Sequence, residues 1–403
     1  MCLRLTTLLI ALCLAVLCPA TAYSNSGMSD TQWVARFKDK DPVVRGKAAL
    51  AVGQLGPEAK AAVPALIEIL GDTGRARGPK DFFGDTVGGC AAEALIMIGE
   101  AGVAGLRDAL KSPNRHARLM ALRGLDHFQV RHELRKQAQA MVPALVDALK
   151  DKEAEVRANA AGILGGMGEV ASTAVTALLA VLKDGDAGVR SATALALGSI
   201  RTEPSTVVPA LAAALTDKDR GVRVSALRAI GGYGAAAKAA VPTLMDRLNQ
   251  DSTDLRGEIV RTLGLIGSAA SAAAPALAAL LMSGDLQQRL DVAVALVRIG
   301  ERKGEAIAAV VDKLTDKDDR VRVESAEAIG SMGAAGKAAV PALIRALKDK
   351  STRVRRSAVS ALGRIGPDAS EAMPALTESL KDTEKSIGTA ATRALQQIGA
   401  AKK

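Results

Sequence analysis

Aromatic residues are scarce in this chain, making up 2% of its 403 residues, whereas apolar residues reach 49%. A core built from Ala, Leu, Val and Ile suits closely packed helices and not a β-sandwich, which would contain more aromatic and β-branched side chains. The shortage also argues against binding of single-stranded nucleic acid, because such sites stack bases on aromatic rings. We therefore expect a helical protein with no nucleic-acid partner.

Cysteine and histidine are also rare, which limits covalent and metal chemistry. Cys2, Cys13 and Cys18 lie near the N-terminus and leave only Cys90 further along, so no disulfide forms within the remaining chain. Cys90 stands between two small residues, which predicts a small core side chain and not a nucleophile. The three histidines are spaced by eleven and five residues, too far apart or on different helix faces to share a metal. We predict no metal and no cofactor.

The N-terminus has the pattern of a secretory signal. Arg4 precedes an apolar run from Leu8 to Leu17, and Ala20-Thr21-Ala22 fits the small-x-small cleavage pattern. We predict a signal peptide over residues 1–22 and a linker over 23–30, with an uncleaved anchor as the alternative. No later apolar run approaches ~20 residues, so the mature chain is expected to lack a transmembrane segment. The protein would then be exported from a bacterial cell, either to the periplasm or to the medium.

The formal charge is +10. A basic surface favours anionic partners such as acidic proteins, anionic polysaccharides or lipid head groups.

A repeat dominates the rest of the sequence. The segments Val208-Pro209-Ala210-Leu211, Val241-Pro242-Thr243-Leu244 and Val340-Pro341-Ala342-Leu343 align on their prolines, and the alignment extends to eleven units. Eight of the ten intervals are 33 residues and the others are 40 and 39. We call the aligned residue the repeat start; the starts are Thr31, Pro64, Ala104, Pro143, Thr176, Pro209, Pro242, Pro275, Ala308, Pro341 and Pro374.

Each unit has the pattern of a helix, a polar turn and a second helix. Proline suits the first turn of a helix, and large apolar residues two and six positions later share one helical face. In eight units an Asp stands eight residues after the start, where it can cap a turn or the second helix. Gly363, Gly366 and Pro367 illustrate the stop signal after the second helix. Because one short helix pair cannot bury its apolar face alone, we predict an all-α superhelix over residues 31–403.

The pattern Val-Pro-Ala-Leu, Asp, Val-Arg and Ala-Leu-Gly-x-Ile-Gly resembles the HEAT-repeat family, specifically its short bacterial form named after phycobilisome lyases. The resemblance implies an α-solenoid in which the recurring Asp and Arg form a ladder between adjacent repeats. A basic stripe for binding is the functional alternative. The pattern departs at the interrupted second repeat and at Gly388, which replaces the last Arg. The arginines stand fourteen residues after the repeat start: Arg45, Arg118, Arg157, Arg190, Arg223, Arg256, Arg289, Arg322 and Arg355.

Two insertions interrupt the repeat, near residues 73–89 and 127–140. Insertions in solenoids form loops on one face, often the binding face, and aromatic and Arg side chains are favoured interface anchors. The alternative is that the aromatic pair in the first insertion simply packs the loop onto the core. The candidate partner-binding residues are Arg75, Arg77, Lys80, Phe82, Phe83, His127 and His132.

Catalytic motifs are missing: the sequence contains no G-x-S-x-G, H-E-x-x-H, P-loop or paired-cysteine pattern. Related repeats occur in deoxyhypusine hydroxylase, which holds two irons through several His-Glu dipeptides, but only His132-Glu133 is present here. Bilin lyases and HEAT-like DNA glycosylases act inside the cell. We therefore predict a non-catalytic scaffold that binds a protein on the concave face of the second helices and on the first insertion. The alternatives are an enzyme accessory acting on a cofactor-bearing protein, and a binder of anionic polysaccharide or lipid.

Overall fold

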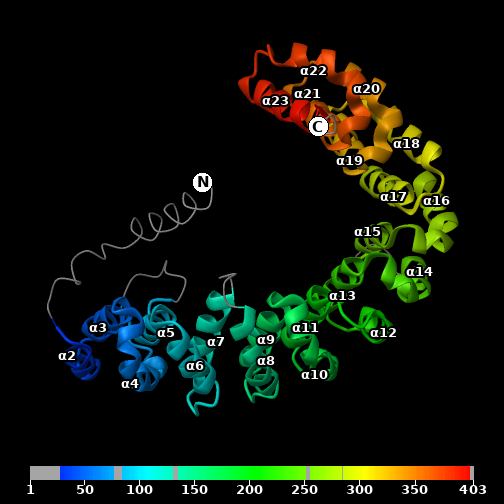
Figure 1. The fold of residues 1–403 in the computed structure, drawn as a ribbon. Coiled ribbons are helices and arrows are strands. Elements are labelled where there is room, and N and C mark those ends of the chain that lie inside the picture. The colour runs from blue at the N-terminus through cyan, green and yellow to red at the C-terminus, as the bar shows by residue number, and fades with distance from the viewer. Residues whose placement is uncertain (1–27, 77–83, 130–134, 251–254, 284, 400–403) are drawn as a thin grey trace. The chain divides into compact units, whose positions relative to one another are not determined.

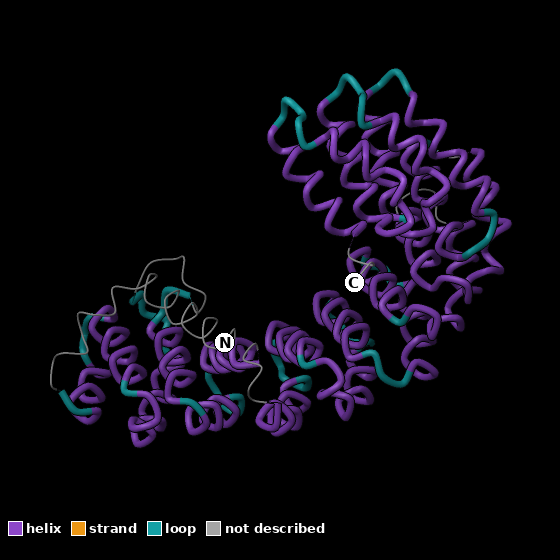
Figure 2. The backbone as a smooth tube through the Cα atoms, turned by 45° about the horizontal axis from the view of Figure 1, so that its top comes forward, coloured by secondary structure: helices purple, strands orange, loops and turns teal. Residues whose placement is uncertain are grey.

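The computed structural model describes residues 28–76, 84–129, 135–250, 255–283 and 285–399. The predicted signal peptide, 1–22, lies outside these residues, as does most of the predicted linker. Within the described ranges the chain is helical, and the only extended pairing is an isolated antiparallel bridge between Arg75 and Thr86 (Figure 2). The chain divides into two compact units, residues 1–200 and 201–403.

The first unit consists of consecutive helix pairs, each matching one predicted repeat. In Figure 1 the second helices α5, α7, α9 and α11 form one row and the first helices α4, α6, α8 and α10 form another. The pairs are α2 (Asp30–Ala35) with α3 (Pro42–Gln54), α4 (Val63–Glu68) with α5 (Val87–Ile98), α6 (Glu100–Ala109) with α7 (Arg115–Gln129), α8 (Arg135–Ala148) with α9 (Ala154–Gly166), and α10 (Val175–Val181) with α11 (Ala187–Ile200).

The second unit repeats the same arrangement, which confirms the predicted all-α solenoid. Its second helices α13, α15, α17, α19, α21 and α23 pack side by side in chain order. The pairs are α12 (Pro204–Ala213) with α13 (Arg220–Gly232), α14 (Val241–Gln250) with α15 (Arg256–Ile266), α16 (Ala274–Ser283) with α17 (Leu286–Ile299), α18 (Lys303–Asp312) with α19 (Asp319–Ser331), α20 (Val340–Ala346) with α21 (Thr352–Ile365), and α22 (Met373–Ser379) with α23 (Lys385–Gly399).

Small residues let neighbouring second helices approach closely. A Cβ added to Gly165 would lie 2.7 Å from the Cα of Ala196, and one added to Gly330 would lie 2.9 Å from the Cα of Ala361. Larger side chains at these crossings would push the helices apart, since the nearest atom at each is backbone and cannot move aside. The close approach explains why the core uses alanine and glycine in place of aromatics.

The predicted apolar positions are buried, with one departure. Leu66, Leu70 and Leu106 are fully buried, as the spacing of four predicts. Leu380, six residues after the last repeat start, is 43% exposed. In an earlier repeat the 3₁₀ turn that carries Leu70, Ile69–Gly71, packs against the next second helix, α7. Leu380 belongs to the last described repeat, so no following helix pair covers it.

The stretch Arg256–Leu281 is long and apolar enough to cross a membrane by length and composition. It is not one straight helix, because it consists of α15, a 3₁₀ segment Gly267–Ala273 and α16, with non-helical backbone at Ala270. Both α15 and α16 pack against α17. These contacts are those of core helices in a solenoid. The prediction that no later apolar run approaches ~20 residues did not take this stretch into account.

The connections between repeats take a form that the sequence pattern did not specify. A 3₁₀ segment of seven residues, such as Gly56–Ala62 and Gly333–Ala339, joins a second helix to the next first helix. Its first glycine has a positive φ, 63° at Gly56 and 58° at Gly333. That conformation strains any residue with a Cβ, which explains the glycine stop signal.

Gly333→Ala should lower the free energy of unfolding by about 1 kcal/mol, because the backbone there has a left-handed conformation that disfavours a Cβ. The added Cβ would meet no atom within 4 Å, so steric contact adds nothing to this cost. The matched control is Gly162→Ala inside α9, where a Cβ also meets nothing. This control should raise stability by about 0.5–1 kcal/mol. Urea unfolding followed by circular dichroism measures both. Equal effects of the two substitutions would contradict the assigned backbone role of Gly333.

Candidate functional site

The repeated arginines bind the repeats to one another. Arg157 Nε donates to Asp184 Oδ2 at 2.7 Å, and Arg322 Nε donates to Asp349 Oδ2 at 2.8 Å. The Nη1 of Arg322 also donates to the backbone carbonyls of Asp316 and Lys317 in its own turn. The same ion pair joins Arg45 to Asp72, Arg118 to Asp151 and Arg355 to Asp382. The predicted ladder is confirmed at these five positions.

The ladder is irregular in the middle of the second unit. The Asp position eight residues after the repeat start holds Gln250 and Ser283 in the seventh and eighth repeats. The Nε atoms of Arg256 and Arg289 are buried and have no hydrogen-bond partner within the described ranges. The hydrogen bond from Nε that forms the ladder elsewhere is therefore missing at these two arginines, while Thr262 and Arg298 donate to backbone carbonyls of neighbouring repeats.

The arginines also lower the pKa values of their aspartate partners. The hydrogen bond from Arg355, together with the backbone N–H of Glu384, lowers the pKa of Asp382 to about 2. Arg157 likewise lowers the pKa of Asp184. A folded-state pKa below the unfolded value of about 3.9 contributes stability above that value, and this stability is lost as the pH falls toward 2.

Arg355→Gln should lower the free energy of unfolding by roughly 2–3 kcal/mol at pH 7, because it leaves a largely buried carboxylate without its partner. The difference from the unchanged chain should narrow between about pH 4 and pH 2, as Asp382 becomes protonated. Urea unfolding at both pH values tests this. The control is Lys337→Gln, which removes an exposed ion pair with Asp368 and should change stability by less than about 0.5 kcal/mol. A difference that stayed constant with pH would contradict the assigned role of this ion pair.

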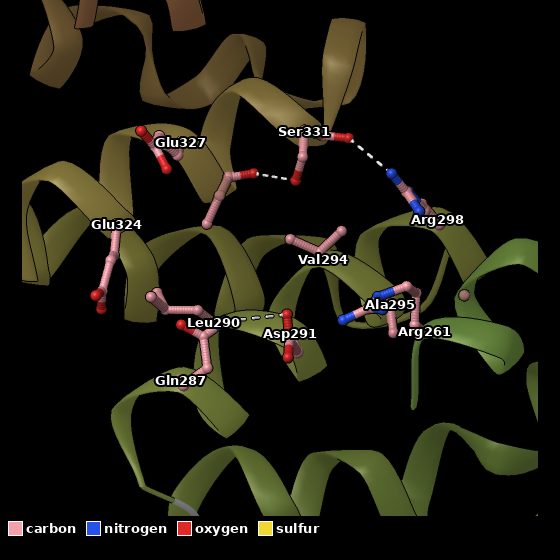
Figure 3. Close-up of a pocket in the computed structure, with 12 residues that line it drawn as sticks. Arg261, Gln287, Leu290, Asp291, Val294, Ala295, Arg298, Glu324, Glu327 and Ser331 are labelled. Atoms are coloured by element: carbon pink, nitrogen blue, oxygen red, sulfur yellow. Dashed lines mark hydrogen bonds between the residues drawn. The ribbon is translucent and has the colours of Figure 1, made fainter. Parts of the chain in front are cut away.

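The second helices present a face that the core does not use. Side chains sixteen, nineteen and twenty-three residues after the repeat start project from this surface, which we call the second-helix face. In the seventh to ninth repeats it encloses a hollow of about 300 Å³ between α15, α17 and α19 (Figure 3). The side chains and glycine that line it are Arg261, Gly264, Gln287, Leu290, Asp291, Val294, Ala295, Arg298, Glu324, Glu327, Ala328 and Ser331.

Acidic residues recur on this face at one register position. Glu258, Asp291 and Glu324 stand sixteen residues after three consecutive repeat starts, and Glu327 lies one helical turn beyond Glu324. We call these four residues the acidic row. Figure 3 shows Asp291 near the centre of the hollow, with Glu324 and Glu327 on one side and the arginines on the other.

The carboxylates of the acidic row differ in how they are neutralised. Arg261 lies 3.6 Å from Glu258, and Ser357 Oγ donates to Glu327 at 3.4 Å. Asp291 accepts one hydrogen bond, from Gln287 Nε2 at 3.3 Å. Burial is the main reason that the pKa of Asp291 is raised, and the nearby carboxylate of Glu258 adds to the effect. Asp291 and Glu324 have no ion pair within the described ranges, so a cation would lower the free energy of both.

The next second helices carry the opposite charge. Helix α21 has four arginines and no acidic residue, and α23 has one Lys, one Arg and no acidic residue. Arg355 is used in the ladder, whereas Arg353, Arg356 and Arg364 are exposed and have no ion pair in the described part of the chain. We call these three exposed residues the arginine patch. On α15–α19 the second-helix face therefore carries carboxylates together with arginines such as Arg261 and Arg298, whereas on α21 its charged residues are arginines alone.

Comparison with known proteins agrees with the repeat pattern. The family model for HEAT repeats matches residues 103–198, 142–231, 175–254, 208–298, 241–330 and 307–396. The chain belongs to the HEAT-repeat family. The model for the PBS lyase HEAT-like repeat matches residues 44–72, in line with the short bacterial form that the sequence resembles. No curated protein sequence matches the chain.

Solved structures with a similar fold include importin-β chains. Importin-β crystallised in ammonium sulfate matches with a TM-score of 0.63 and 12% identity, over 96% of this chain and 60% of that chain. Kap95 from a complex with Nup1 matches with a TM-score of 0.62 and 13% identity, over 94% and 58%. Kap95p bound to RanGDP matches with a TM-score of 0.59 and 17% identity, over 92% and 56%. The chain therefore spans less than two thirds of these proteins, and the likeness concerns the fold.

The structure describes only some of the predicted partner-binding residues in the two insertions. Arg75 is exposed, and its Nε donates to Asp85 Oδ2 at 2.6 Å across the base of the first insertion. Arg77, Lys80, Phe82, Phe83 and His132 lie outside the described residues. His127 belongs to α7, but its side chain is not described. Of the seven candidates only Arg75 is described with its side chain, so their grouping and their role stay predictions.

The second insertion contributes helix on both sides. Helix α7 continues to Gln129 and α8 begins at Arg135, well before the repeat start at Pro143. The predicted loop near 127–140 is therefore mostly helical where it is described. The third histidine, His116, belongs to α7, and its Nε2 is 3.3 Å from Oγ1 of Thr86 at the end of the first insertion. Burial lowers the pKa of His116. Within the described ranges no group of three His, Cys, Asp or Glu could hold a metal ion.

Proposed function

We propose that this chain is an exported, non-catalytic scaffold that binds a protein partner through the second-helix face of its second unit. The observation that carries the proposal is the charged hollow on α15, α17 and α19. Its carboxylates and arginines take no part in the ladder or the apolar core, so folding does not account for them. A surface that carries charges of both signs can be complementary to a protein surface of the reverse pattern, which speeds association and sets specificity.

Structures with a similar fold support the same class of function. The HEAT-repeat solenoid is typical of protein-interaction scaffolds, and Kap95 has been captured with Nup1 and with RanGDP. Those partners belong to those proteins. What this chain shares with them is a stack of helix pairs, which offers a long surface built from equivalent positions.

A photo-crosslinking amino acid in place of Leu265 should form a covalent adduct with the partner in cells that produce the chain. Leu265 is 46% exposed on the second-helix face and directly follows Gly264, which lines the hollow. The matched control replaces Ala213, which is exposed on the first helix α12. Adducts are detected as slower bands by immunoblotting. Adducts at both positions, or at neither, would contradict binding through this face.

A third crosslinker position separates the two surfaces predicted for binding. Arg75 is exposed at the base of the first insertion. An adduct at Arg75 but not at Leu265 would keep the scaffold function and move its recognition surface to the insertion.

Export is part of the proposal and has its own test. Production in a bacterial host should release a chain that begins at Tyr23, as read by mass spectrometry of its N-terminal peptide. Ala22→Leu should block the cleavage, because the residue before the cut must be small, whereas Thr21→Leu should leave it intact. Recovery of the unchanged chain with Met1 from the cytoplasm would show that residues 1–22 do not direct export.

A further inference from the structure

We propose that the second-helix face of α15–α21 binds a protein segment of divided charge, with basic residues on the acidic row and acidic residues on the arginine patch. This inference rests on the proposed function and names the chemistry of its partner. It depends on three features of the described residues: the hollow, the carboxylates without ion pairs, and the reversal of charge at α21.

The hollow can hold a cationic side chain. Its volume is about 300 Å³, and Asp291 and Glu324 line it without an ion pair. A half-buried carboxylate forms stronger charge-assisted hydrogen bonds than one in water. The lining holds three carboxylates, those of Asp291, Glu324 and Glu327, against two arginines. A lysine or arginine from a partner would balance the remaining negative charge.

The arginine patch gives the second half of the complementarity. Helices α19 and α21 pack side by side, so the arginine patch directly follows the acidic row along the stack. The aliphatic stem of Arg364 lies on α19, with its Cδ 3.4 Å from the position of a Cβ on Gly330. A uniformly basic segment would meet repulsion at α21, and a uniformly acidic segment would meet it at α17 and α19.

The spacing of the helices sets the spacing of the partner's charges. Packed helices lie about 8–10 Å apart, and an extended chain advances about 3.3 Å per residue. Three residues of an extended partner therefore cover one repeat. A segment that crosses the second helices should carry a basic residue at about every third position over α15, α17 and α19, followed by acidic residues over α21 and beyond.

Synthetic peptides test this directly with the purified chain. The probe is a fluorescent peptide with three Lys at every third position followed by two Glu at every third position, separated by Gly and Ser. Three control peptides carry Lys only, Glu only, or the same Lys and Glu in alternating order. Fluorescence anisotropy at low salt should show the divided peptide binding at least about fivefold more tightly than each control, because only its charges match both zones.

Substitutions then locate the peptide. Asp291→Asn with Glu324→Gln should weaken binding of the divided peptide by roughly tenfold, and Arg356→Gln with Arg364→Gln by roughly fivefold. The matched controls are Glu378→Gln on α22 and Arg345→Gln on α20, both exposed on first helices, and they should leave binding unchanged. Circular dichroism confirms that each variant remains folded.

Several outcomes would overturn the inference. These are equal binding of the divided and alternating peptides, unchanged binding by the Asp291 and Glu324 variant, or no binding of any peptide. Preferential binding of the Glu-only peptide or of polyphosphate, lost with the arginine substitutions alone, would assign the face to polyanions instead. In each case an adduct at Leu265 would still support the scaffold function. Failure of this inference can therefore be told apart from failure of the proposed function.

Discussion

The ion pair between an arginine of one repeat and an aspartate of the next is the interaction on which the rest of the structure depends. Arg322 illustrates its design, since one guanidinium reaches the carboxylate of Asp349 and two backbone carbonyls of its own turn. It therefore fixes the turn between two helices and the position of the following repeat together. Both side chains are mostly buried, so screening by salt weakens the pair less than it would a surface ion pair.

The close contact of the second helices is the complementary constraint. Glycine and alanine at the crossings of α9 with α11 and of α19 with α21 bring the helix backbones together. One side of each second helix is thereby committed to packing. The remaining side, at sixteen, nineteen and twenty-three residues after the repeat start, is free to vary from repeat to repeat. In the second unit these positions hold carboxylates on α15, α17 and α19, and α21 carries exposed arginines. We therefore propose that this face of the second unit binds the partner.

Much of the fold was readable from the sequence because the same physical requirement recurs in every unit. The proline at Pro341 begins a helix, the glycine at Gly333 adopts a positive φ, and Leu66 and Leu106 are buried. Other features were not readable. The 3₁₀ form of the connections depends on packing between repeats, and the early start of α8 at Arg135 replaces a predicted loop. The exposure of Leu380 depends on the absence of a described repeat beyond it.

The candidate site was harder to predict from the sequence than the fold. The sequence directed attention to the insertions, because they carry rare aromatic residues and break the period. Asp349 has a structural role, because it accepts the ladder hydrogen bonds of Arg322. Asp291 and Glu324 have no such partner within the described residues, so the proposed site includes them. The signal was present, since position sixteen is acidic in three consecutive repeats. Only the structure shows that this position faces away from the ladder and that the three repeats enclose one hollow.

The most direct measurement of the central claim is carboxyl footprinting of the chain with and without its captured partner. A carbodiimide couples an amine to accessible carboxylates, and mass spectrometry reports the modified residues. The account predicts that the partner protects Glu324 and Glu327 on the second-helix face. It also predicts that Asp312 and Glu378 on first helices react equally in both states. Protection of the first-helix carboxylates, with Glu324 and Glu327 unchanged, would contradict the claim that this face is the recognition surface.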